Sequence, residues 1–392
     1  MKLSSRPSSP MRVSRHASNA APALDGGSST SARVSVNVTR AVPFGPLSHQ
    51  CMDVYSPATS DGDILGSGAP CVLFVHGGGW KLFSRESHAN VGRALARCGF
   101  VAALPSYRLS PVSLARMAPL YAIVSAVLSA VPLAIWALAA APAPPTAAAV
   151  ACFIVPLVMF VAVHVALFGI CRTPVLHPTH LSDVSAAAEW MHTHAADFGG
   201  DPSRFAIAGH SAGAHLACMA AFAPGAPPIA AAVLISGPYD AGLMVSAAAF
   251  GWIDRYFRRA WYMYTAFGPD SSAWDASFPT GLLRARLQGV SARQPNGMAE
   301  RFPFLLMNAE RDWGTQDHTA LLIPLLERCG HPTKVVAVPN SSHVSLVQGF
   351  DSPGSVSERV ALPVIASWLR GVFGANVAPA TLVGISPAIP KG

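Results

Sequence analysis

Residues 205–215 have the sequence Phe-Ala-Ile-Ala-Gly-His-Ser-Ala-Gly-Ala-His, which is the strongest local signal in the chain. The apolar run from Phe205 to Ala208 predicts a buried strand, and the Ala-rich residues after Ser211 predict a helix. Between them, Gly-x-Ser-x-Gly is typical of a sharp turn from strand to helix that exposes a serine hydroxyl. The helix that follows directs backbone N–H groups and the positive end of its dipole toward that serine. The stretch therefore predicts Ser211 as a nucleophile at the end of a strand.

Short apolar runs alternate with helical patterns on both sides of this stretch. Strands are predicted over Cys71–Val75, Phe100–Leu104, Phe205–Ala208, Ala232–Ser236, Phe304–Asn308 and Val335–Val338. Helices are predicted up to about Cys98 and over about 182–197, 212–222, 316–329 and 355–370. This alternation predicts an α/β fold with a mostly parallel sheet and helices on both of its faces.

A glycine-rich turn, His76-Gly77-Gly78-Gly79-Trp80, follows the first of these strands. Glycine permits the backbone angles that turn successive N–H groups inward. We expect Gly78 and Gly79, with the N–H of Ala212, to donate to the oxyanion of a tetrahedral intermediate. A phosphate-binding loop is disfavoured, because neither the Gly-x-Gly-x-x-Gly spacing nor a following Lys-Ser/Thr is present.

An acid and then a histidine should follow later strands if Ser211 belongs to a catalytic triad. Asp312 follows the strand at 304–308, and His343 follows the strand at 335–338. In this arrangement Ser211 attacks, His343 accepts its proton and Asp312 orients the imidazole. The rival acids are Glu310 and Asp317, and the rival histidines are His215, His318 and His331.

The sequence also suggests which groups contact the substrate. We expect Trp80, His210 and Tyr239 to line the substrate pocket. No cofactor is expected, and no metal site, because no His-Glu-x-x-His or similar ligand spacing is present. The seven cysteines are scattered without Cys-x-x-Cys spacing, which is typical of a reducing compartment.

One long segment has no charged residue at all. Between Arg116 and Arg172 lie 55 residues without Asp, Glu, Lys or Arg. Two runs, 117–140 and 147–170, are each long enough to cross a bilayer, and a Pro-rich turn separates them. The prediction is an inserted transmembrane hairpin over 117–171, and the arginines near its ends favour a cytosolic catalytic domain. The endoplasmic reticulum is one candidate membrane. The alternative is a pair of apolar cap helices folded onto the domain.

The whole chain has 392 residues, of which 51% are hydrophobic and only 12% are charged. This composition excludes a wholly disordered protein. The net charge of +7 is scattered, so it favours an anionic membrane surface over a nucleic acid as partner. Oligomeric state is not indicated.

The predicted organisation has five parts. A Ser-, Arg- and Pro-rich tail over 1–40 precedes the first part of the α/β domain at 41–116. The hairpin follows, then the second part of the domain at 172–373 and a tail at 374–392. The first tail contains no acid before Asp25, so a disordered tail and a transit peptide are both compatible with it.

A second membrane-related pattern lies at 252–264, where aromatic residues are mixed with arginines. This mixture suits a lipid headgroup interface. The alternative is a cap helix whose aromatic side chains line the substrate pocket, and the two interpretations are compatible.

With these motifs in place, the chain resembles α/β-hydrolase esterases of the hormone-sensitive-lipase and feruloyl-esterase-like group. The likeness covers about 50–370. Its motifs are the oxyanion loop at 76–80, Tyr107-Arg108-Leu109-Ser110-Pro111, Asp183, the turn at 198–204 and the serine stretch at 209–215. Ser211 to His215 is most similar to isoprenylcysteine methylesterases and kynurenine formamidases.

The resemblance implies a serine hydrolase that cleaves carboxylic esters. Together with the hairpin it suggests a membrane-anchored carboxylesterase acting on a hydrophobic ester, with a prenylcysteine methyl ester as the sharpest candidate. The expected partners are thus a small-molecule or lipidated ester and membrane lipid. The alternatives are an arylformamidase-type amidase on a soluble aromatic substrate and a non-catalytic membrane-tethered interaction protein.

Overall fold

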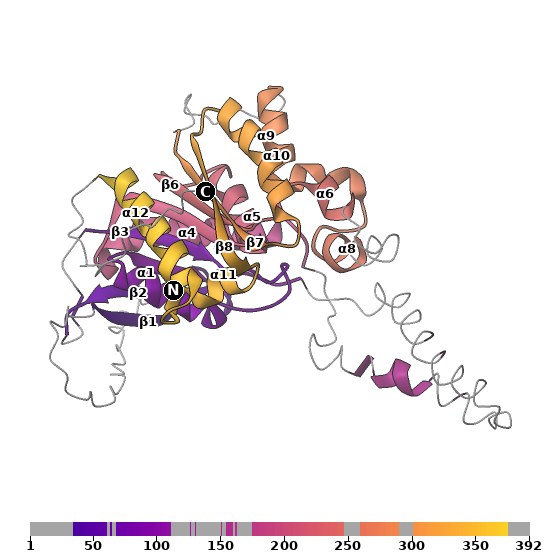
Figure 1. Ribbon diagram of the computed structural model, residues 1–392, viewed down its shortest axis with the longest axis horizontal. Coiled ribbons are helices and arrows are strands. Elements are labelled where there is room, and N and C mark those ends of the chain that lie inside the picture. The colour runs from indigo at the N-terminus through magenta and orange to yellow at the C-terminus, as the bar shows by residue number, and fades with distance from the viewer. Residues whose placement is uncertain are drawn as a thin grey trace, which may run out of the picture.

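The computed structural model describes residues 34–60, 63–64, 68–110, 175–246, 259–289 and 301–374, with positions 126, 130, 150, 154–159, 161 and 162. Its centre is an eight-stranded sheet in the order β1-β2-β4-β3-β5-β6-β7-β8 (Figure 1). The strands are β1 (Ser35–Pro43), β2 (Cys51–Ala58), β3 (Ala69–Val75), β4 (Val101–Pro105), β5 (Gly200–His210), β6 (Ala231–Ile235), β7 (Phe304–Arg311) and β8 (Thr333–Ser342). All strands from β4 to β8 are parallel to one another, and β1 and β2 are antiparallel to their neighbours. The predicted α/β fold with a mostly parallel sheet is confirmed.

The six predicted strands correspond to β3 through β8, with ends that differ by up to five residues. The strands β1 and β2 were not predicted, and β1 begins at Ser35, within the tail predicted over 1–40. In β1, polar Ser35, Asn37 and Thr39 alternate with Val36 and Val38. That pattern belongs to a half-buried edge strand and lacks the continuous apolar run that marks a central parallel strand.

Helices cover both faces of the sheet. On one face the core includes side chains of α1 (Ala89–Arg97), α11 (Ser345–Gln348) and α12 (Leu362–Phe373). On the other face it includes α4 (Thr179–His194), α5 (Ala212–Ala221), α9 (Pro279–Leu287) and α10 (Thr315–Arg328). Side chains of β3 alternate between the two faces: Val72 and Phe74 pack with the first set of helices, Leu73 and Val75 with the second.

Shorter elements connect these layers. They are η1 (Glu86–His88), η2 (Ala195–Phe198), α6 (Ala241–Ser246), η3 (Arg259–Met263), α8 (Tyr264–Ala266), η4 (Ser271–Ala273), η5 (Asp275–Ser277), η6 (Gly349–Asp351) and η7 (Ser357–Ala361).

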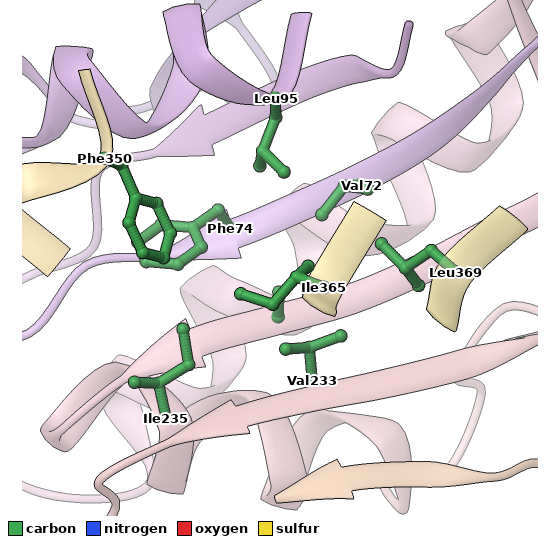
Figure 2. Close-up of a pocket in the computed structure, with 9 residues that line it drawn as sticks. Val72, Phe74, Leu95, Val233, Ile235, Phe350, Ile365 and Leu369 are labelled. Carbon is green, nitrogen blue, oxygen red and sulfur yellow. The ribbon is translucent and has the colours of Figure 1, made fainter. Parts of the chain in front are cut away.

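A small gap in the core lies between the sheet and the helices α1 and α12 (Figure 2). Its volume is about 10 Å³, and its lining is entirely apolar: Val72, Phe74, Leu95, Ala208, Val233, Ile235, Phe350, Ile365 and Leu369. Ligand pockets are roughly 300–1,000 Å³ and contain polar groups that orient the ligand. The gap is therefore a packing feature of the core.

The predicted hairpin at 117–171 lies almost wholly outside the described residues. Within the part of the chain that is described, no helix combines the length and the apolarity that a membrane crossing needs. The described helical positions in this segment include Val155, Val158 and Met159, whose side chains are 57%, 57% and 59% exposed.

Candidate active site

The parallel strands bring five sequence-distant loops to one edge of the sheet. His76 follows β3, Ser211 follows β5, Ser236 follows β6, Asp312 follows β7 and His343 follows β8. The carboxyl ends of parallel strands share an edge, which is where ligands bind in open α/β sheets. The loops that carry the predicted catalytic groups therefore lie together.

Ser211 occupies the predicted sharp turn between β5 and α5. Its backbone angles are φ 54° and ψ −124°, a strained conformation for a residue with a side chain. The turn is close to β3: a Cβ at Gly213 would lie 2.1 Å from the carbonyl oxygen of Val75. Only glycine permits this approach, so Gly-x-Ser-x-Gly is explained here by backbone contact.

His343 and Asp312 form a buried hydrogen-bonded pair. The Nδ1 atom of His343 lies 2.7 Å from Oδ1 of Asp312, and both side chains are buried. Because an ionised carboxylate only accepts hydrogen bonds, Nδ1 must carry the proton, which leaves Nε2 free to accept one. The structure thus brings together the acid and the histidine that the sequence predicts.

The second oxygen of Asp312 is held by three donors. Oδ2 accepts hydrogen bonds from the Ser236 hydroxyl at 2.6 Å, the Asn308 amide at 3.0 Å and the Ala309 N–H at 2.9 Å. Burial by itself would raise the pKa of Asp312, but hydrogen bonds from His343, Ser236 and Asn308 outweigh it and lower the pKa. The carboxylate is therefore kept ionised and fixed in orientation.

The rival residues make other contacts. Glu310 accepts a hydrogen bond from the N–H of Asn340. His318 accepts backbone N–H groups of Tyr239 and Asp240, and His331 lies 3.2 Å from the carbonyl of Phe302. His215 lies between Trp80 and the carbonyl of Ser277.

The glycine-rich loop at 76–80 reaches the turn that carries Ser211. A Cβ at Gly77 would lie 3.2 Å from Cβ of Ser211. Gly78 has φ 120°, and a Cβ there would lie 2.0 Å from the carbonyl oxygen of Leu82, so the loop requires glycine. The loop, Ser211 and Ala212 are thus adjacent, which is the arrangement an oxyanion hole needs. The donor roles of Gly78, Gly79 and Ala212 stay predictions.

His210, which directly precedes Ser211, contacts His343. The His210 ring lies 4.8 Å from the His343 ring, and Nε2 of His210 donates to the backbone carbonyl of His343 at 2.9 Å. Between Ser211 Oγ and His343, no hydrogen bond is present among the described residues. Such catalytic hydrogen bonds are often long in free enzymes and tighten in the substrate complex.

The three residues predicted to contact substrate are all buried. Trp80 is 1% exposed and donates through Nε1 to His215, and Tyr239 accepts the N–H of Gly237 through its hydroxyl. His210 supports the loop that carries His343. All three side chains are packed inside the protein, and the substrate contact predicted for them stays a prediction.

The aromatic stretch at 252–264 is described from residue 259 onward. There the ring of Tyr262 lies against the glycine-rich loop, since a Cβ at Gly79 would be 2.9 Å from its Cε1 atom. The ring also lies 5.6 Å from the ammonium group of Lys81. These contacts favour the cap interpretation for the end of the stretch.

Two residues near the predicted triad were not themselves predicted. Ser236 bonds to Asp312, and the indole of Trp313 lies over the imidazole of His343. The available signals were weak: Ser236 ends a predicted strand, and Trp313 directly follows the predicted acid.

Buried neutral histidines predict how stability depends on pH. Burial lowers the pKa values of His76, His180 and His210 to about 3. The unfolded chain, with histidine pKa near 6.5, binds more protons at acidic pH. Stability is thus complete above about pH 6.5 and falls as pH decreases toward 3, by at most about 1.4 kcal/mol per pH unit for each histidine.

Urea unfolding at pH 7.5, 6.5 and 5.5 measures this slope. In the variant His180→Gln, the slope of the unfolding free energy against pH should be smaller by the equivalent of about one proton. A stability that is flat from pH 7.5 to 5.5 would contradict the prediction. Asp312 acts in the same direction, because its lowered pKa contributes stability that is lost as pH falls below about 4, the pKa of an unfolded aspartate.

Comparisons with known proteins place the fold in a class. A family model described as alpha/beta hydrolase fold matches residues 175–347. Esterase B from Lactobacillus rhamnosis HN001 superposes with a TM-score of 0.56 and 17% identity, covering 86% of each chain. A hyperthermophilic esterase from Pyrobaculum calidifontis gives a TM-score of 0.55 and 20% identity, again over 86% of each chain. The chain therefore has the α/β-hydrolase fold.

Two curated relatives come from Mycobacterium tuberculosis. The esterase LipQ is 24% identical over 210 residues, which are 50% of this chain and 45% of LipQ. The probable carboxylic ester hydrolase LipM is 46% identical over 50 residues, which are 13% of this chain and 12% of LipM. The matches span less than half the length of these relatives.

Proposed function

We propose that the protein is a serine carboxylesterase of the EC 3.1.1 type. The observation that carries this proposal is the buried Asp312–His343 pair at the sheet edge where Ser211 occupies its strained turn. Esterases named among the relatives and the superposed structures support it.

Acylation begins when Ser211 Oγ attacks the ester carbonyl and its proton passes to Nε2 of His343. The resulting imidazolium is stabilised by Asp312, which already accepts the Nδ1 proton. The oxyanion accepts hydrogen bonds from Gly78, Gly79 and Ala212. His343 then donates its proton to the leaving alcohol, and an acyl-Ser211 intermediate remains.

Deacylation repeats these roles with water as the nucleophile. His343 removes a proton from the water as it attacks the acyl carbonyl, and returns that proton to Ser211 Oγ as the C–O bond breaks. The residues of this chain supply every proton transfer in both halves.

We further propose a hydrophobic ester substrate presented at a membrane, with a prenylcysteine methyl ester as one candidate. The likeness of residues 211–215 to isoprenylcysteine methylesterases supports the candidate, and the 55 uncharged residues support membrane contact. Several apolar side chains of this segment are exposed, as expected if its surroundings are apolar: Ile154, Val155, Val158 and Met159. Under this proposal the catalytic domain faces the cytosol.

A fluorophosphonate probe tests the catalytic proposal directly. Cells that express the chain are fractionated with a carbonate wash, and each fraction is labelled. Labelling blocked by heat denaturation supports a serine hydrolase, and a folded chain that never labels would leave only a binding function. Labelling confined to the carbonate-resistant pellet supports membrane attachment, whereas soluble labelling would contradict it.

Substrate class is tested by parallel turnover of a prenylcysteine methyl ester, a short 4-nitrophenyl ester and an aryl formamide. We expect both esters to be cleaved faster than the formamide. The reverse order would favour the arylformamidase alternative.

A further inference from the structure

Trp313 is an exposed aromatic residue in contact with the proposed general base. Its indole stacks on the imidazole of His343, with ring centroids 4.3 Å apart and planes inclined by 20°. The residue is nevertheless 68% exposed, whereas His343 is buried. A tryptophan in this position has one face against the imidazole and much of its remaining surface in solvent.

The backbone at Trp313 is held in an unfavourable conformation. Its φ is 49°, in the left-handed region that few side-chain-bearing residues adopt. Gly314 follows with φ 85°, and the turn is closed by Thr315, whose N–H and hydroxyl both donate to the carbonyl of Asp312. Strain of this kind persists where the surrounding structure demands a particular placement. Here the placement puts the indole over His343.

The other contacts of the His343 ring do not fix its tilt. Asp312 holds the ring edge at Nδ1, and a hydrogen bond to a single atom leaves the ring free to tilt about it. His210 makes the second ring contact, inclined by 45°. The nearly parallel indole restricts tilting and keeps water from the face it covers.

We propose that Trp313 is a positioning residue that acts through His343 in the esterase reaction. Stacking keeps Nε2 directed toward Ser211 during both proton transfers. The electron-rich indole face also attracts the positive charge that the imidazole acquires when it takes the serine proton. This inference rests on the proposed function, because it requires His343 to be the general base.

Three substitutions separate the stacking from the backbone strain. Trp313→Phe keeps an aromatic face, Trp313→Leu keeps a bulky side chain without one, and Trp313→Gly removes the side chain and relieves the positive φ. We expect Leu and Gly to lower kcat by about 10- to 100-fold, with KM changed less than about threefold. Phe should retain most of kcat.

Stability gives the complementary readout. Because glycine accepts φ 49°, Trp313→Gly should melt at or above the temperature of the unmodified protein. Ala41→Gly is the matched control: Ala41 also has a positive φ of 52°, and it lies on β1. This control should keep kcat unchanged.

Full kcat in Trp313→Leu, or equal losses in Phe and Leu, would overturn the inference. A rise in KM without loss of kcat would also overturn it, since that pattern indicates a substrate contact. Failure of the proposed function is distinguishable, because it would appear as a folded unmodified protein that neither turns over esters nor labels with a fluorophosphonate.

Discussion

Ser211→Ala is expected to lower kcat for a 4-nitrophenyl ester by up to about 10⁶-fold. Without Oγ no acyl-enzyme forms, so the reaction loses its nucleophile, and only the oxyanion donors and substrate binding remain. Both fluorophosphonate labelling and burst-phase release of nitrophenol should disappear. Steady-state kinetics on the purified variant, with the labelling gel beside it, provide the measurement.

The experiment separates loss of catalysis from loss of folding. Alanine can replace serine in the turn without filling new space, so the variant should fold and melt within a few degrees of the unmodified protein. Ser203→Ala is the matched control, because Ser203 lies on the same strand, β5, but away from the end that carries Ser211. If Ser211→Ala retained ester turnover while folded, the proposed mechanism would be abandoned.

Asp312→Asn is expected to lower kcat by about 10⁴-fold. In the native site, Oδ2 of Asp312 accepts from Ser236, Asn308 and Ala309, while Oδ1 accepts the Nδ1 proton. An asparagine oxygen would remain with the three donors, so its NH₂ group would face His343. The imidazole would then accept at Nδ1 and carry its proton on Nε2, the tautomer that cannot remove a proton from Ser211.

Asp317→Asn is the control for this prediction, because Asp317 was a rival acid and lies in the first turn of α10. It should change kcat by less than about twofold. Kinetics at saturating substrate, together with circular dichroism, separate loss of catalysis from loss of folding. Equal losses in Asp312→Asn and Asp317→Asn would contradict the assignment of Asp312.

The central strands were predictable because each is an apolar run buried on both faces. The run from Cys71 to Val75 gives the same signal whichever strands flank it, and β3 is found there. The strands β1 and β2 were missed for the opposite reason, because β1 alternates polar with apolar side chains and β2 carries buried polar residues. Asp53 of β2, for example, is buried and bonded to Arg40 and Arg85.

Local sequence was enough to predict the strand-to-helix turn at Ser211, the glycine loop and the chain order of Ser211, Asp312 and His343. These features depend on neighbouring residues, so a local pattern is enough to predict them. Tertiary structure decided which acid meets which histidine, that Ser236 bonds to Asp312, and that Trp313 lies over His343. It also decided that Trp80 and Tyr239 are buried. The contacts of Asp312 and His343 join the ends of β6, β7 and β8. They depend on strand order and register, and both are determined by residues that lie far apart in the chain.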